Sequence, residues 1–74
     1  MKIEIRLFAT LRNERGKALD IEVEQNSSVG TVLDLLQIRQ EDVALLLVNG
    51  RDSSLDAQLA EGDVLSLFPP VGGG

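Results

Sequence analysis

The chain has 74 residues, a length that allows one domain and excludes a multidomain enzyme. It contains no cysteine, histidine, tryptophan or tyrosine, which excludes a thiol nucleophile, an imidazole base, a disulfide framework and a Cys/His zinc site. The chain has 7 lysines and arginines, which form no cluster, and 12 aspartates and glutamates. The resulting net charge of −5 disfavours binding to nucleic acid and favours a basic protein partner.

The first 24 residues predict a β-hairpin. Apolar side chains occupy every second position in residues 2–9 and again from residue 19 to residue 23, which is the period of strands with one buried face. The polar segment 13–17 lies between these strands and contains Gly16, which suits a turn.

Residues 29–38 are predicted to form a helix. Ser28 is suited to cap it, because its hydroxyl can accept a hydrogen bond from an unpaired amide of the first turn. An apolar stripe with helical spacing is formed by Val29, Val32, Leu33 and Leu36. Leu35 flanks this stripe, and Gly30 is a local weakness in the helix.

The following apolar segment, residues 43–48, is predicted to be a central strand that is covered on both faces. Asn49-Gly50 is a strong signal for a hairpin turn, so residues 51–53 are expected to return as a brief strand. Residues 54–60 are expected to form a short connection with room for one helical turn.

The chain ends in a strand and a tail. A turn at residues 61–63 precedes the last strand, residues 64–68, which the next two prolines end because proline donates no ladder hydrogen bond. We therefore expect a two-layer α+β domain over residues 1–68 and a flexible, extended tail over residues 69–74. The six residues of this tail can reach roughly 20 Å into a narrow cleft of another protein.

Five stretches spread over the whole chain carry a family pattern. They are Leu7–Arg12, Ser28–Leu33, Val48–Gly50, Glu61–Val64 and Phe68–Gly74. In these stretches the chain resembles the ubiquitin-like sulfur carriers of the MoaD/ThiS type, and within them the small subunit of molybdopterin synthase. The ending Phe-Pro-Pro-Val-Gly-Gly-Gly is the most specific of the five. The resemblance implies a β-grasp fold, with a mixed sheet of four to five strands packed on one main helix.

The resemblance also implies that the reactive group is the terminal carboxylate of Gly74. A carboxylate with a pKa of about 3.5 is ionised at neutral pH and is a poor electrophile. In the family, a ubiquitin-activating-type adenylyltransferase uses ATP and magnesium to form an acyl-adenylate, and a sulfur donor protein then provides the sulfur of a thiocarboxylate. That group delivers sulfur inside a partner such as the large subunit of molybdopterin synthase. Such a carrier needs no catalytic side chain and no bound cofactor of its own.

Other functions stay open. The sulfur could pass instead to the thiamin thiazole, to cysteine or to a thiolated tRNA. Gly74 could form isopeptide bonds with target lysines, as in a ubiquitin-like protein modifier. The domain could also be a non-covalent interaction module whose tail is incidental. Gly72 departs from many relatives, which have a residue with a side chain before the glycine pair.

The residues expected to contact partners lie in the tail and beside it. They are Gly73, Gly72, Val71, Pro70, Pro69, Phe68, Phe8 and Arg12. Gly73 has no Cβ and allows close approach to a partner. Phe68 is expected either to pack at the sheet end or to join an apolar docking surface. Phe8 is out of phase with the buried positions and is expected to face outward, where it either docks a partner or packs elsewhere. Arg12 matches an arginine common in the family and is expected to pair with an acidic partner residue or to be solvated.

Several kinds of site and location are not expected. The chain has no phosphate-binding glycine loop with a lysine, so ATP should bind to the activating partner. Carboxylate pairs such as Glu41-Asp42 and Glu61/Asp63 are interpreted as solvated or capping groups rather than metal ligands. The first residues alternate in charge where a signal peptide needs an apolar run, and no apolar run has transmembrane length. We therefore expect a cytoplasmic protein that binds neither membrane nor nucleic acid.

Overall fold

The computed structural model describes residues 1–13 and 15–70 of the chain. The elements in this part, in chain order, are β1 (Lys2–Leu7), the 3₁₀ helix η1 (Ala9–Arg12), β2 (Ala18–Glu22), α1 (Val29–Leu35), the 3₁₀ helix η2 (Gln40–Asp42), β3 (Leu45–Val48), β4 (Arg51–Asp52) and β5 (Val64–Phe68). The strands and α1 follow the predicted order. The two 3₁₀ helices were not predicted.

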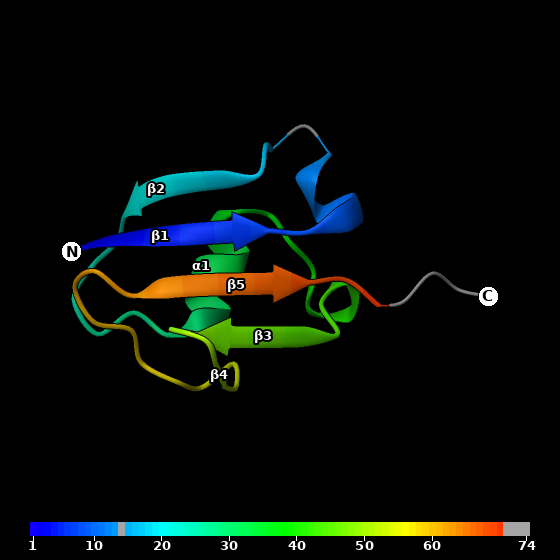
Figure 1. The fold of residues 1–74 in the computed structure, drawn as a ribbon. Coiled ribbons are helices and arrows are strands. Elements are labelled where there is room, and N and C mark those ends of the chain that lie inside the picture. The colour runs from blue at the N-terminus through cyan, green and yellow to red at the C-terminus, as the bar shows by residue number, and fades with distance from the viewer. Residues whose placement is uncertain (14, 71–74) are drawn as a thin grey trace.

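The described strands form one mixed sheet in the order β2-β1-β5-β3-β4. β1 and β5 are parallel, and the other neighbouring pairs are antiparallel. α1 covers one face of this sheet, and no other described helix or strand covers the opposite face (Figure 1). The predicted ubiquitin-like β-grasp fold is confirmed. Because β5 is the middle strand, the chain leaves the sheet at its centre.

The core lies between α1 and one face of the sheet. Its most deeply buried side chains, each at most 1% exposed, are Ile3, Ile5, Leu7, Val29, Val32, Leu33, Leu65 and Leu67. Burial of one such side chain is worth roughly 1.5–3 kcal/mol relative to exposure. The buried side chains of the strands and the apolar stripe of α1 therefore pack together in a single core layer, which holds β5 in place.

The first strand ends two residues earlier than its sequence period predicts. Ala9 adopts a left-handed backbone conformation with φ of 52°, and the chain turns into η1. Phe8 stays extended, and its amide donates a hydrogen bond to the carbonyl of Leu67 at 3.2 Å. Phe8 thus prolongs the line of β1 beside β5. The predicted hairpin with β2 is confirmed by the antiparallel pairing of the two strands.

Both ends of α1 have a local explanation. The Ser28 hydroxyl accepts a hydrogen bond from the Thr31 amide at 3.2 Å, so the predicted cap is confirmed. The helix ends three residues before the predicted position because Gln37 adopts a left-handed conformation with φ of 58°. The amide of Ile38 then donates to the carbonyl of Leu33 at 2.9 Å, which closes the helix in a Schellman motif.

The prediction that residues 43–48 form a central strand covered on both faces is wrong. The strand begins at Leu45, and β3 lies between β5 and the short β4. Leu46 and Val48 pack against the core, whereas Leu45 is 42% exposed. In a two-layer fold each strand has only one covered face, so the apolar run is longer than the core requires.

The turn after β3 is tied to the start of β5. Asn49 and Gly50 have φ of 53° and 83°, which confirms the predicted tight turn. The Asn49 side-chain amide donates to Asp63 Oδ1 at 2.9 Å, and its carbonyl accepts from the Val64 amide at 2.9 Å. Asp63 Oδ2 accepts from the Ala60 amide at 2.8 Å. These bonds fix the point from which β5 runs toward the tail.

The connection between β4 and β5 contains turns and no helix, so the helical turn considered for residues 54–60 is absent. It packs on the start of α1, where the Gly30 amide donates to the Leu55 carbonyl at 2.9 Å. A Cβ on Gly30 would lie 3.4 Å from that carbonyl oxygen, so the glycine suits this close approach. Within residues 1–13 and 15–70, no helix is long and apolar enough to cross a membrane.

Candidate functional site

The central strand places the root of the tail at one end of the sheet (Figure 1). Because β1 and β5 are parallel neighbours, Phe8 at the end of one lies beside Phe68 at the end of the other. Pro69 and Pro70 follow Phe68, where the strand ends as predicted. The predicted contact residues Val71, Gly72 and Gly73 and the reactive Gly74 lie outside the described residues.

The two phenylalanines form a stack on the open face of the sheet. Their ring centroids are 4.1 Å apart and their planes differ by 10°. They are the only aromatic residues of the chain, and both are half-buried. The expectation that Phe8 lies out of phase with the buried positions is confirmed. The ring of Phe68 packs on Phe8, as the packing reading expects, and the residue is still partly exposed, so its role in docking stays a prediction.

Arg12 lies against this stack. Its Nε donates to the carbonyl of Leu7 at 2.8 Å, and its guanidinium carbon is 5.5 Å from the centroid of the Phe8 ring. This geometry is a cation–π contact, and the hydrogen bond fixes the guanidinium plane. The residue as a whole is exposed. The guanidinium is therefore positioned to offer its remaining N–H donors to a carboxylate from outside.

One residue beside this stack was not predicted from the sequence to belong to the site. Leu45 lies directly across from Phe68 in the pairing of β3 with β5, and it is one of two exposed large hydrophobic residues in the described chain. Leu45 belongs to the apolar run of residues 43–48, but this run predicts a strand covered on both faces and so gives no indication that Leu45 is exposed. We call Phe8, Arg12, Leu45, Phe68 and Pro69 the tail-root surface. It joins an apolar patch to a cation where the chain leaves the sheet.

A cleft of about 390 Å³ lies beside the tail-root surface. Its lining residues are Thr10, Leu11, Arg15, Ile38, Asp42, Pro69 and Pro70. Arg15 donates from its two terminal nitrogens to the carbonyls of Leu11 and Gln37, each at 3.4 Å, and so connects η1 with the end of α1. The unpredicted elements η1 and η2 supply part of the lining. No sequence pattern indicated this cleft.

An exposed ion pair borders η2, which contributes Asp42 to this cleft. Arg39 Nη2 lies 2.7 Å from Glu41 Oε2. The hydrogen bond and the charge of Arg39 lower the pKa of Glu41, and the carboxylates of Glu41 and Asp42 raise the pKa of Arg39. Both side chains are largely solvent-exposed. Because both side chains are in water, the ion pair contributes little to the stability of the fold.

The described residues arrange no reacting group at this end of the sheet. Asp63, one of the carboxylates considered as a metal ligand, uses both oxygens in hydrogen bonds to Asn49 and Ala60. No group of three or more acidic, histidine or cysteine residues within residues 1–13 and 15–70 could hold a metal ion. The arrangement supplies instead an apolar and cationic contact surface around the point where the chain leaves the sheet.

Comparison with known proteins places the chain in a family. The family model described as the ThiS family matches residues 5–74. The chain is 33% identical over 92 aligned residues to small archaeal modifier protein 3 of Haloferax volcanii, and the alignment covers 100% of both proteins.

Solved structures show the same fold. The crystal structure of small archaeal modifier protein 1 of H. volcanii has a TM-score of 0.80 at 28% identity and covers 95% of this chain and 98% of its own. A chain in the complex of subunits 1 and 2 of the molybdopterin-converting factor from Helicobacter pylori 26695 has a TM-score of 0.69 at 26% identity, with 100% of both chains covered. By its matching residues and its fold, this chain belongs to the ThiS family of ubiquitin-like β-grasp proteins.

Proposed function

We propose that this chain is a sulfur carrier whose Gly74 carboxylate is activated by a partner enzyme and converted to a thiocarboxylate. One observation carries the proposal. The middle strand of the sheet ends at Phe68 and continues into two prolines, and the described residues around this point form an apolar and cationic contact surface. Membership of the ThiS family supports the same role. The domain then serves to hold and present the end of its own chain.

Activation makes the carboxylate electrophilic. A carboxylate oxygen of Gly74 attacks the α-phosphorus of ATP, pyrophosphate leaves, and an acyl-adenylate forms. A sulfur nucleophile from a donor protein next attacks the carbonyl carbon, and AMP leaves. The donor's sulfur is a persulfide, so this attack gives an acyl disulfide between Gly74 and the donor. A second thiol then attacks the donor-side sulfur, the S–S bond breaks, a disulfide forms on the donor side, and Gly74 leaves as a thiocarboxylate. In this scheme ATP and magnesium occupy the site of a ubiquitin-activating-type adenylyltransferase.

The tail-root surface docks the carrier on that enzyme. Phe8, Phe68 and Leu45 provide apolar area that a partner can bury, and Arg12 provides a positioned cation for a partner carboxylate. Residues 69–74 can span roughly 20 Å, which is enough to reach a recessed nucleotide site. The terminal glycines let the backbone approach groups that would clash with a Cβ.

We propose molybdopterin synthesis as the destination of the sulfur. The likeness to a chain in the complex of subunits 1 and 2 of molybdopterin-converting factor supports a large synthase subunit as the partner that accepts it. Thiamin thiazole, cysteine or tRNA thiolation would use the same activated terminus with another acceptor. Capture of a thiazole synthase in place of the large synthase subunit would redirect the proposal to one of these.

A second function, protein modification, is favoured by the 33% identity to a protein named as a small archaeal modifier. Here a lysine amine of a target attacks the acyl-adenylate carbonyl, an amide bond forms, and AMP and a proton leave. The last lysine or arginine of the chain is Arg51, so trypsin would leave residues 52–74 on a modified target. The variant Gly72→Arg would shorten this remnant to two glycines, which mass spectrometry of host proteins can detect on lysines.

The proposal is tested by ATP–pyrophosphate exchange with the adenylyltransferase of the native host. The full chain should stimulate exchange, and a chain lacking Gly73 and Gly74 should not, although its circular dichroism is unchanged. Arg12→Gln should raise the KM for the carrier by about tenfold, as expected for the loss of a charged contact of about 1.4 kcal/mol. The matched control Arg51→Gln removes the same charge on β4 and should not. Undiminished exchange with the truncated chain would contradict the proposal.

A further inference from the structure

A groove lies between α1 and the loop that precedes it, away from the tail-root surface. Its volume is about 650 Å³, and its lining includes Glu22, Val23, Glu24, Ser27, Thr31 and Leu35. β2 runs antiparallel to β1, so the groove begins at the opposite end of the sheet from Pro69 (Figure 1). A partner in this groove would leave the tail free.

The helix contributes an unpartnered apolar side chain to this groove. Leu35 is 61% exposed, the highest value among the large hydrophobic side chains of the described residues. Thr31 precedes it by one helical turn and therefore lies on the same side of α1. Val23 on the loop is only 7% exposed and belongs to the core. The groove thus has an exposed apolar group on one wall and part of the packed core on the other.

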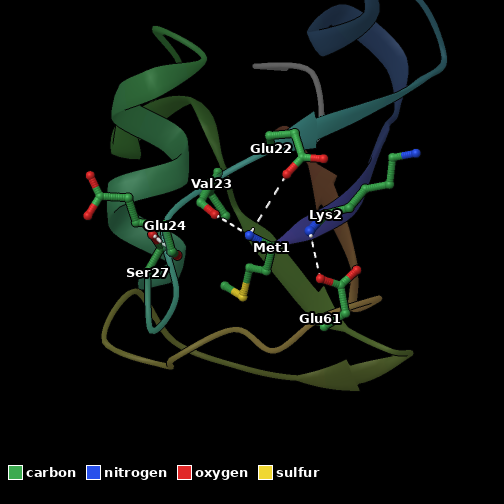
Figure 2. A network of polar contacts seen from close by, with 7 residues as sticks. All are labelled: Met1, Lys2, Glu22, Val23, Glu24, Ser27 and Glu61. Atoms are coloured by element: carbon green, nitrogen blue, oxygen red, sulfur yellow. Dashed lines mark hydrogen bonds and ion pairs between the residues drawn. The ribbon is translucent and has the colours of Figure 1, made fainter.

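The loop wall is held in place by hydrogen bonds. The Ser27 hydroxyl donates to the carbonyl of Glu24 at 2.7 Å, and the Ser27 amide donates to the same oxygen at 3.2 Å. The amide of Val23 donates to the Met1 carbonyl at 2.8 Å, which attaches the loop to β1. Figure 2 shows these residues beside the helix. A ligand would therefore meet a groove that is already formed, with little ordering cost.

The charged side chains that line the groove are all carboxylates, and the positive groups beside it include the N-terminal ammonium and Lys2, which lies across from Glu22 in the pairing of β1 with β2. None of the eight lining residues is lysine or arginine. The Glu22 side chain is 77% exposed, and its ion-pair partner among the described residues is the N-terminal ammonium at 3.9 Å. Glu24 forms no ion pair within residues 1–13 and 15–70. Two carboxylates beside the exposed side chain of Leu35 attract a basic segment and repel an acidic one.

We propose that this groove is a second docking site, which binds a basic, amphipathic segment of a partner protein. An apolar side chain of that segment covers Leu35, and its lysines or arginines pair with Glu22 and Glu24. This localises the basic partner that the net charge of −5 favours. The site is independent of the proposed function, because it uses neither the tail nor the tail-root surface.

The test is a titration of the full chain, followed by ¹H–¹⁵N chemical shifts, with a synthetic helical peptide that has one leucine flanked by lysines. The largest shift changes are expected at residues 22–27, 31 and 35. The double variant Glu22→Gln/Glu24→Gln should weaken binding about fivefold or more, and Leu35→Ala should weaken it to a similar extent. A peptide of the same pattern with glutamates in place of lysines should not bind.

The matched control is Asp52→Gln/Asp56→Gln, which changes the net charge by the same amount at exposed positions that do not line the groove. It should weaken peptide binding less than about twofold, the effect of general charge alone. Equal weakening by the two double variants would overturn the proposal. So would shift changes centred outside the groove, or an absence of binding to the unmodified chain.

Discussion

The stacking of Phe8 on Phe68 is the contact that joins the ends of β1 and β5 at the root of the tail. We predict that the stack itself, apart from the burial of its rings, stabilises the fold by about 0.5–1.5 kcal/mol. Replacement of each phenylalanine by leucine keeps most of the apolar volume and removes the ring. Phe68→Leu should cost about 0.5–1.5 kcal/mol of unfolding free energy. Phe8→Leu should cost up to about 1 kcal/mol more, because it also removes the cation–π contact of Arg12.

A double-mutant cycle isolates the stack. The Arg12 contact disappears with Phe8 in both backgrounds, so it cancels, and the remaining coupling between Phe8→Leu and Phe68→Leu should be about 1 kcal/mol. The chain has no tryptophan or tyrosine, so urea unfolding is followed by far-ultraviolet circular dichroism. A control cycle of Phe8→Leu with Ile21→Val, at the other end of the hairpin, should be additive. A coupling below about 0.3 kcal/mol in the first cycle would refute the reasoning.

Three further predictions concern the scaffold. Gln37→Gly should stabilise the chain by about 0.5–1 kcal/mol in urea unfolding, because glycine adopts the left-handed conformation of the helix end without a Cβ penalty; a loss of stability would contradict this. Asp63→Asn should destabilise by about 1–3 kcal/mol, because two charge-assisted bonds weaken, while Asp52→Asn on exposed β4 should change stability by less than about 0.5 kcal/mol. Arg39→Gln should raise the pKa of Glu41 toward its ordinary value in an NMR titration, and an unchanged pKa would refute the pairing. Since the folded-state pKa of Glu41 is lowered, any stabilisation from this pair is complete above the unfolded pKa and is lost as the pH falls through the folded one.

The elements that the sequence predicted well are those that local patterns determine. The alternating positions of residues 2–7 and 19–22 and the Ser28 cap each depend on neighbours a few residues away, and each is present in the structure. The ends of β1 and α1 were misplaced because Ala9 and Gln37 adopt left-handed conformations. Neither residue type signals that conformation, which glycine would have marked.

The sequence predicted most residues of the tail-root surface but not how they are arranged relative to one another. Phe8, Phe68 and Arg12 were all named from the sequence, but their stacking depends on the parallel pairing of β1 with β5, which joins segments far apart in the chain. Leu45 was missed because a run of apolar residues does not reveal which face the helix covers. The cleft beside Pro69 depends on two 3₁₀ helices without a sequence signal.

The central claim is that the end of the chain, at Gly74, is the reactive group of this protein. Intact-mass spectrometry of the protein purified from its native host tests it most directly, with fragmentation to locate the change. The account predicts a population in which one terminal oxygen of Gly74 is replaced by sulfur, and the loss of this population when the host adenylyltransferase is deleted. A terminus that carries only oxygen, in cells where the adenylyltransferase is active, would contradict the claim.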